Sequence, residues 1–159
     1  MKKYNFKFAS GFTLPELIIT MSVFVTLISL ATISLVNVRK ESSLSTTIDV
    51  LIGDMRQQQL KAMIGDTEHT GTQDAYGVYL SEFTYILFKG SSYDPGSSSN
   101  FSIPYGGSIE AENPGATVIY ARRSGDLTGG ATSITLIDTA SGKEQSISIN
   151  AYGVVTAVN

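Results

Sequence analysis

Residues 11–16 read GFTLPE, and residues 17–38 read LIITMSVFVTLISLATISLVNV, a run without a charged side chain. At about 1.5 Å of rise per residue, a helix over this run is roughly 33 Å long, enough to cross the hydrocarbon core of a bilayer. Glu16 lies one residue before the run. An ionisable side chain at the edge of a membrane span is costly and indicates a function. The sequence therefore predicts a membrane-spanning helix that begins with a functional carboxylate.

The composition limits the classes of function that the chain can perform. It has 159 residues, no cysteine and a single histidine, His69. Disulfides, thiolate nucleophiles and multi-histidine metal sites are therefore excluded. Three of the 11 basic residues lie in residues 1–11, which leaves 8 basic and 14 acidic side chains, a formal −6, for the rest of the chain. This acidic remainder argues against general nucleic-acid binding.

The sequence contains no recognisable catalytic motif. It contains neither a G-x-S-x-G nucleophile elbow nor a Walker phosphate loop. Residues 126–130, DLTGG, lack the regular run of oxygen ligands that a calcium loop needs. We therefore expect neither an enzyme nor a bound cofactor or metal.

The N-terminal segment is open to three interpretations. A cleaved secretory signal has an apolar region of about 7–15 residues and a small-residue cleavage site, whereas this run is longer and ends in VNVRK at residues 36–40. A plain signal anchor would keep Lys2, Lys3 and Lys7 in the cytoplasm, but it does not explain Glu16. The third interpretation rests on a family resemblance.

Residues 11–17, GFTLPEL, resemble the cleavage and methylation signature of type IV prepilins and type II secretion pseudopilins, and the resemblance extends over about residues 8–40. It implies that a prepilin peptidase cuts after Gly11 and that Phe12 becomes the N-methylated first residue. It also implies that Glu16 neutralises the N-terminal ammonium of a neighbouring subunit during filament assembly. Pro15 departs from the aliphatic residue common in the family, but it lies in the first helical turn, where its missing N–H breaks no helix bond.

Helical periodicity continues beyond the apolar run. We expect one helix from about Phe12 to Ile64, ended by the polar, glycine-flanked residues 65–72. Gly53 is a weak point, about 1 kcal/mol less favourable than alanine. Polar residues, among them Asp54, Gln57 and Gln58, are expected on one side of this second half. The apolar stripe expected on the other side, within about 120° of arc, comprises Leu44, Ile48, Leu51, Ile52, Met55, Ala62 and Met63.

Short β-rich segments separated by glycine-bearing turns follow the helix. Their spacing is typical of one or two antiparallel sheets packed on the helix stripe. The predicted fold class is α+β: a long N-terminal helix with a membrane-spanning half and an amphipathic half, packed against a C-terminal, pilin-like antiparallel β-sheet domain. The expected strands are residues 75–80, 83–89, 101–105, 108–111, 117–122, 133–137, 145–150 and 154–158.

The predicted organisation has four parts. These are a cleaved basic leader (1–11), a transmembrane and filament-core helix (12–38), its amphipathic continuation (39–64) and a β-rich extracytoplasmic domain (65–159). A looser resemblance to H-type minor pseudopilins comes from residues 54–63, 76–80, 146–150 and 153–155, and it favours a minor subunit. The protein is then expected in the inner, cytoplasmic membrane as a single-pass protein, and afterwards in the pilus or pseudopilus.

The leading hypothesis is a structural subunit, inserted in the membrane, whose partners are the prepilin peptidase and other pilin or pseudopilin subunits. One alternative is a DNA- or surface-binding minor pilin at a pilus tip, with Arg122 and Arg123 as the DNA contacts and Lys143 nearby. Another is a signal-anchored extracytoplasmic domain with no filament role. The sequence leaves open whether secretion, twitching, adhesion or competence is served.

Overall fold

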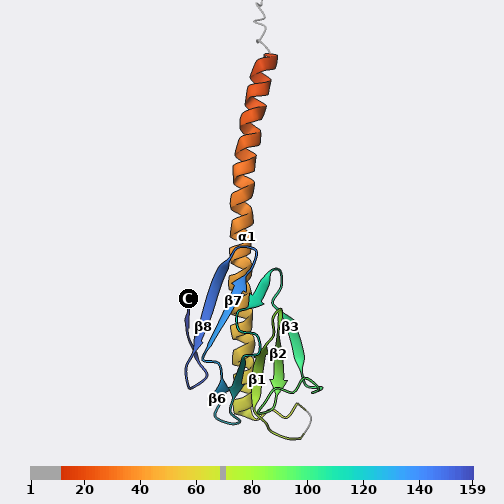
Figure 1. Cartoon of the computed structure of the whole chain (residues 1–159), viewed down its shortest axis with the longest axis vertical. Coiled ribbons are helices and arrows are strands. Elements are labelled where there is room, and N and C mark those ends of the chain that lie inside the picture. The colour runs from red at the N-terminus through yellow and green to blue at the C-terminus, as the bar shows by residue number, and fades with distance from the viewer. Residues whose placement is uncertain (1–11, 69–70) are drawn as a thin grey trace, which may run out of the picture. The chain divides into compact units, whose positions relative to one another are not determined.

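The computed structural model describes residues 12–68 and 71–159, and within α1 the side chains of residues 30–42 lie outside this description. The described residues form one long helix, α1 (Leu14–Ile64), followed by short strands (Figure 1). The leader (1–11) and His69 lie outside the described residues. The strands are β1 (Tyr76–Leu80), β2 (Thr84–Lys89), β3 (Phe101–Pro104), β4 (Ile109–Ala111), β5 (Thr117–Tyr120), β6 (Leu127–Gly130), β7 (Ser133–Asp138), β8 (Lys143–Ile149) and β9 (Val155–Val158).

The chain divides between Val38 and Arg39 into two compact units, Met1–Val38 and Arg39–Asn159. The second unit contains all the strands and the buried core.

The C-terminal end of α1 is closed by its own backbone. Gly65 has a φ of 67°, and its N–H donates to the carbonyl of Ala62 at 3.3 Å. The N–H of Asp66 donates to the carbonyl of Lys61 at 3.0 Å. These two bonds are those of a Schellman motif, in which a glycine in the left-handed conformation satisfies the last carbonyls of a helix. The glycine that the sequence offered as a stop signal therefore ends the helix.

The strands form two antiparallel sheets. The five-stranded sheet has the order β3-β2-β1-β5-β6, and the four-stranded sheet has the order β4-β7-β8-β9. The strands expected at residues 75–80 and 83–89 are confirmed as β1 and β2, which form a hairpin with Tyr76 opposite Lys89 and Leu80 opposite Tyr85. All other strand pairs are antiparallel as well.

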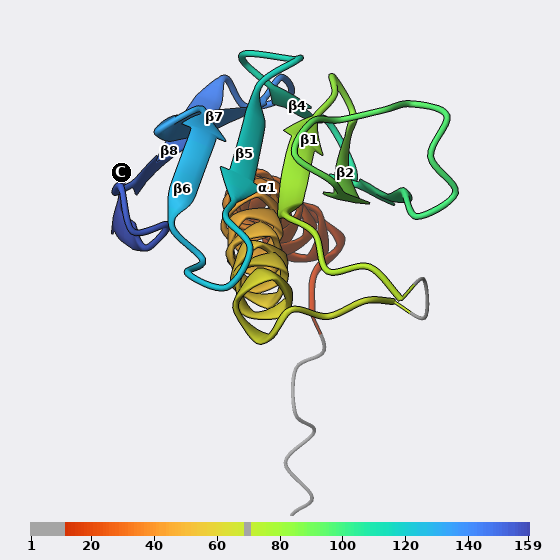
Figure 2. The ribbon, with the colours of Figure 1, turned by 90° about the horizontal axis from the view of Figure 1, so that it is seen from below.

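The core lies between the second half of α1 and both sheets, whose strands form an arc along one side of the helix (Figure 2). The buried apolar side chains of the helix match the expected stripe except at Met63, which is exposed. Burial of these apolar side chains, at roughly 25 cal/mol per Å², holds the sheets to the helix. The helix contributes Leu44, Ile48, Leu51, Ile52, Met55 and Ala62, and the sheets contribute residues such as Tyr76, Val78, Tyr85, Val118, Tyr120, Ile134, Leu136, Ile147 and Ile149.

Gln59 of α1 connects turns that belong to different sheets. Its Nε2 donates to the carbonyl of Gly125 at 3.0 Å and to the carbonyl of Tyr152 at 2.8 Å. Gly125 lies in the turn before β6, and Tyr152 lies in the turn between β8 and β9. The N–H of Leu127 also donates to the carbonyl of Ala151 at 2.9 Å. One end of the core is therefore tied together by hydrogen bonds among three elements.

The structure corrects the membrane-spanning half of the predicted fold. Among the described residues, no helix is both long enough and apolar enough to cross a membrane. On the described residues, the predicted membrane-spanning half is therefore wrong, and so is the single-pass location in the inner membrane that depended on it.

Candidate assembly surface

The first part of α1 presents apolar side chains on all of its sides. We call residues 12–29 the apolar segment. Its large hydrophobic side chains are each at least half exposed within the chain. Contiguous apolar surface of this kind is rare on isolated soluble proteins and marks an interaction site. The exposed residues are Phe12, Leu14, Leu17, Ile18, Ile19, Met21, Val23, Phe24, Val25, Leu27 and Ile28.

The hydroxyl side chains of the apolar segment bond to the helix that carries them. Thr20 and Ser22 donate to the carbonyls three residues earlier, at 3.0 and 2.7 Å. Thr26 donates to the carbonyl of Val23 at 2.8 Å, and Ser29 donates to that of Val25 at 2.9 Å. Backward bonding of this type satisfies a hydroxyl without a neighbour. These side chains therefore do not interrupt the apolar character of the surface.

Glu16 lies in the first turn of α1. There the partial positive charge of the helix N-terminus favours a carboxylate. Within the part of the chain that the structure describes, Glu16 forms no ion pair and is exposed to solvent. The candidate partner, the ammonium created by cleavage, would belong to another copy of the chain.

The start of α1 also has a residue spacing that would permit a capping role for Glu16. Thr13 immediately precedes the helix, and its carbonyl accepts a hydrogen bond from the N–H of Leu17 at 3.1 Å. Thr13 and Glu16 have the T-x-x-E spacing of a capping box, in which the acidic side chain reaches back to the N–H of the capping residue. That pattern was legible in the sequence. Any test of Glu16 must therefore separate its charge from its capping ability.

The predicted cleavage site is only partly described. Gly11 lies outside the described residues, whereas Phe12 precedes α1 and is 81% exposed. The predicted cleavage after Gly11 and the predicted methylation of Phe12 therefore stay predictions.

The structure does not gather the predicted basic residues into one cluster. β5 ends at Tyr120, so Arg122 and Arg123 occupy the turn before β6 rather than a strand end. Arg122 Nη1 donates to the carbonyl of Gln73 at 3.4 Å, and the N–H of Arg123 donates to the carbonyl of Ala62 at 2.8 Å. Lys143 instead lines a cavity beside Leu44. Because Leu44 and Ala62 are about 27 Å apart along a helix, Lys143 and the arginines do not form one DNA-binding patch.

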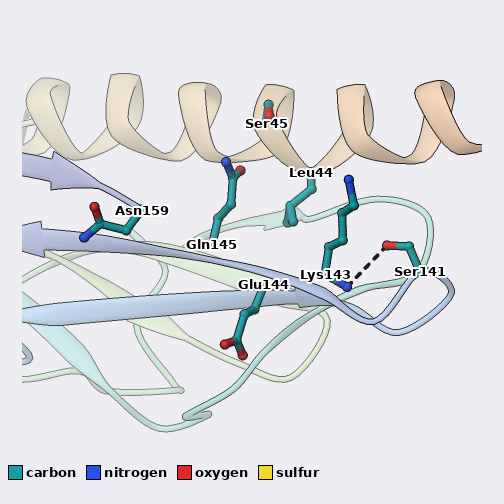
Figure 3. A pocket seen from close by; sticks show the side chains of 7 residues that line it. All are labelled: Leu44, Ser45, Ser141, Lys143, Glu144, Gln145 and Asn159. Atoms are coloured by element: carbon teal, nitrogen blue, oxygen red, sulfur yellow. Dashed lines mark hydrogen bonds between the residues drawn. The ribbon is translucent and has the colours of Figure 1, made fainter.

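The cavity beside Leu44 measures about 250 Å³ and lies between α1 and β8. Figure 3 shows Lys143 and Gln145 pointing from β8 toward the helix, whereas Glu144 points away from it. Gln145 Oε1 is buried there and has no hydrogen-bond partner among the described residues.

A second cavity, of about 220 Å³, lies against the second half of α1. Asp54, Gln58 and Lys61 of the helix line it together with Glu68. Gln58 is 2% exposed, and its Oε1 has no hydrogen-bond partner among the described residues. The prediction that Gln58 lies on the polar side of α1 is therefore wrong.

Aromatic residues lie on and beside the serine-rich loop of residues 90–100, and most of them pack against other rings. Tyr93 stacks on Tyr79 with a centroid separation of 4.0 Å. Tyr105 is buried and lies 5.6 Å from Tyr85, centroid to centroid. Phe101 on β3 is 64% exposed and borders the second cavity.

Asp138, on β7, is held by several hydrogen bonds. Asp138 is buried and accepts hydrogen bonds from the hydroxyls of Ser108 and Ser141 and from the N–H of Ala140. Burial raises the pKa of the Tyr120 hydroxyl well above its ordinary value, and it does the same for Tyr105. Among the described residues, no three His, Cys, Asp or Glu side chains lie close enough together to hold a metal ion.

The apolar segment, with Glu16 in its first turn, is thus the most unusual surface on the described chain. Its large hydrophobic side chains are exposed, and the hydroxyls of Thr20, Ser22, Thr26 and Ser29 bond to the helix itself. Comparison of the chain with protein-family models, with curated proteins and with solved structures gave no match.

Proposed function

We propose that this protein is a structural subunit of a filament of the type IV pilus or type II secretion pseudopilus class. The observation that carries the proposal is the apolar segment, which is exposed on all sides. A helix that is apolar all round is stable when other elements bury it. The same segments of neighbouring subunits are also apolar on all sides, so they can pack together and bury each other. The resemblance of residues 11–17 to a prepilin cleavage signature supports the same function. The looser resemblance of the second unit favours a minor subunit.

In this proposal, Glu16 determines how neighbouring subunits are aligned along the filament. Cleavage after Gly11 would give Phe12 a new N-terminal ammonium group. A carboxylate buried without a partner among apolar helices is destabilising, whereas a carboxylate next to an ammonium is compensated. Subunits would therefore assemble in the arrangement that places the Glu16 carboxylate of one copy beside the Phe12 ammonium of the next.

Substitution of Glu16 by glutamine separates this pairing role from the capping role. Glutamine also fits the third position of a capping box, so Glu16→Gln preserves the helix start but removes the charge. We expect Glu16→Gln to be processed normally and to enter filaments at least about tenfold less than wild type, which corresponds to the loss of about 1.4 kcal/mol. Quantitative immunoblotting of sheared filaments from the source organism measures this.

The controls for Glu16 are chosen within the same turn. Glu16→Asp keeps the charge and should retain more incorporation than Glu16→Gln, although its side chain is shorter. Thr13→Ala weakens the cap by about 1 kcal/mol without altering charge, and it should leave incorporation close to wild type. If Glu16→Gln enters filaments as efficiently as wild type, pairing by charge is excluded and Glu16 is a capping residue.

Processing is tested on the mature protein itself. Mass spectrometry of the N-terminal peptide should show a methylated Phe12 in the wild-type protein and no cleavage in Gly11→Trp, because a bulky residue there obstructs the peptidase. A mature protein that retains Met1, or that begins near Lys40, would show that the chain is a signal-anchored or secreted domain and not a filament subunit.

A further inference from the structure

We infer that the cavity lined by Asp54, Gln58, Lys61 and Glu68 is a binding site for an alkylammonium group. The cavity measures about 220 Å³ and lies wholly within the Arg39–Asn159 unit. This is room for a chain of several methylene groups with a charged head. The site does not depend on the proposed filament role, since none of its residues belongs to the apolar segment. Its remaining lining residues are Gln57, Leu87, Phe88, Ser99, Phe101 and Ile103.

The first observation is a buried acceptor without a donor. Gln58 is 2% exposed, and its Oε1 has no hydrogen-bond partner among the described residues. Leaving a buried polar group unpaired costs about 1–3 kcal/mol, and most such groups in native proteins are satisfied. Because Gln58 lines the cavity, a donor placed there can satisfy it.

The second observation is the charge of the wall. Residues 54, 58 and 61 follow each other at spacings of four and three, so these side chains share one face of α1. Asp54 Oδ2 accepts a hydrogen bond from the hydroxyl of Tyr85 at 2.5 Å, and Glu68 Oε1 pairs with Lys61 Nζ at 2.7 Å. Each carboxylate has a second oxygen, and the two acids exceed the single lysine by one negative charge. The wall therefore favours a cation with N–H donors.

The third observation is the apolar part of the wall. Leu87 and Phe88 of β2 and Ile103 of β3 line the same cavity as the acceptors. An alkyl chain can bury its methylene groups against such residues while its ammonium head reaches polar atoms, as lysine side chains do at protein surfaces. An ammonium has three donors, and Gln58 Oε1 and the carboxylates of Asp54 and Glu68 supply three acceptor groups. The ligand class is therefore an aliphatic primary amine or the lysine side chain of a partner protein.

The test is a titration of the isotopically labelled full-length protein in detergent micelles, followed by NMR at constant ionic strength. The probes are n-butylammonium, neutral 1-butanol and the lysine mimic Nα-acetyl-lysine N-methylamide. We expect saturable shifts of the Gln58 side-chain amide and of the Phe101 backbone amide with n-butylammonium, and none with 1-butanol. Equal binding of the lysine mimic identifies a protein lysine as the fitting ligand, whereas binding of n-butylammonium alone identifies small amines.

Variants assign the binding to named atoms. Gln58→Met removes the acceptor at similar volume and should weaken n-butylammonium binding at least about tenfold, since a hydrogen bond to a charged group is lost. Asp54→Asn removes a charge but keeps an acceptor for Tyr85, and it should weaken binding as well. If Gln58→Met does not fold, the affinity of Asp54→Asn for n-butylammonium tests the proposal instead. Gln145→Met is the matched control, because Gln145 also has an unpartnered buried Oε1 but lines the other cavity (Figure 3).

Two results would overturn the proposal. One is equal response to n-butylammonium and 1-butanol, or no saturable response at all, which would mean that water alone fills the cavity. The other is unchanged affinity in both Gln58→Met and Asp54→Asn, which would place any binding elsewhere. Neither result bears on filament assembly, which Glu16→Gln tests separately.

Discussion

At the scale of single residues, Gly130 shows how closely β5 and β6 approach. Its φ is 98°, a conformation that side-chain-bearing residues rarely adopt, and an added Cβ would overlap the carbonyl oxygen of Thr117. Gly130→Ala is expected to lower the free energy of unfolding by at least about 2 kcal/mol, because conformational strain and steric overlap act together. Urea unfolding followed by circular dichroism measures the difference.

The neighbouring glycine is the matched control for this prediction. A Cβ at Gly129 meets nothing within 4 Å. Gly129→Ala should therefore change the unfolding free energy by less than about 0.5 kcal/mol. Equal losses for both variants would show that the approach of β5 and β6 does not depend on Gly130.

Gln58 shows where reasoning from residue type fails. Met55, Gln58 and Ala62 follow each other at spacings of three and four, so all three lie on the stripe that faces the sheets. The polarity of glutamine assigned it to the solvent side, whereas helix geometry assigns it to the core. By contrast, the position of Glu16 in the first turn could be read from the sequence, because Pro15 and the T-x-x-E spacing both mark a helix start.

At the scale of elements, α1 carries an avoidable weakness at Gly53. This residue lies inside the helix, is exposed, and leaves open space where a Cβ would be. Gly53→Ala should raise the free energy of unfolding by about 1 kcal/mol, because alanine loses less backbone entropy in a helix. Thermal unfolding followed by circular dichroism should show a higher midpoint. A lower midpoint would mean that the glycine serves a contact outside the isolated chain.

The strands show which elements hydrophobic patterning can find. Those rich in Val, Ile and Tyr, such as β1, β2 and β7, lie where the sequence placed them. β6 was missed, because Leu127–Gly130 ends in two glycines and reads as a turn. It is a strand because it pairs with β5 at the sheet edge. The order of strands in each sheet was not predictable, since it depends on contacts between segments far apart in sequence.

At the scale of the whole molecule, the buried tyrosines predict an alkaline limit to stability. Burial raises the pKa of the hydroxyls of Tyr76, Tyr85, Tyr105 and Tyr120 in the folded protein, and the bond to Asp54 adds to the effect at Tyr85. In the unfolded chain these groups titrate near pH 10. Their contribution to stability is therefore complete below about pH 10 and is lost as the pH rises, because the unfolded chain releases protons that the folded protein retains.

The size of this effect is the slope of the unfolding free energy against pH above pH 10. Each buried tyrosine should lower the free energy of unfolding by up to about 1.4 kcal/mol per pH unit above pH 10. Urea unfolding at a series of pH values measures the slope, and Tyr120→Phe should reduce it by the share of one group. Tyr152→Phe, at an exposed position, should leave it unchanged. A free energy of unfolding that is flat across pH 10 would contradict the assignment.

Of the two candidate sites, the assembly surface could be predicted from the sequence, and the cavity at Gln58 could not. The apolar segment and Glu16 follow from local sequence, because a charge-free run and a helix start are local properties. The cavity at Gln58 is formed by α1, β2 and the residues around β3. These segments are far apart in the sequence, so no local sequence pattern predicts that they line one cavity. Lys143 does not join Arg122 and Arg123 for the same reason, since it lies beside Leu44 whereas Arg123 lies beside Ala62.

Gln59 has a consequence for how the domain opens in solution. One side-chain amide holds the turn before β6 and the turn between β8 and β9 to the same point on α1. A fluctuation that frees either turn breaks its bond to Gln59 and also the bond from the N–H of Leu127 to the carbonyl of Ala151, which joins the two turns directly. Opening of one turn is therefore expected to favour opening of the other. Their amide protons should therefore exchange with solvent at matched rates, as one cooperative unit. Two sheets that share no strand are thus linked at this end by Gln59 and by the Leu127–Ala151 bond, in addition to the apolar core that both sheets share.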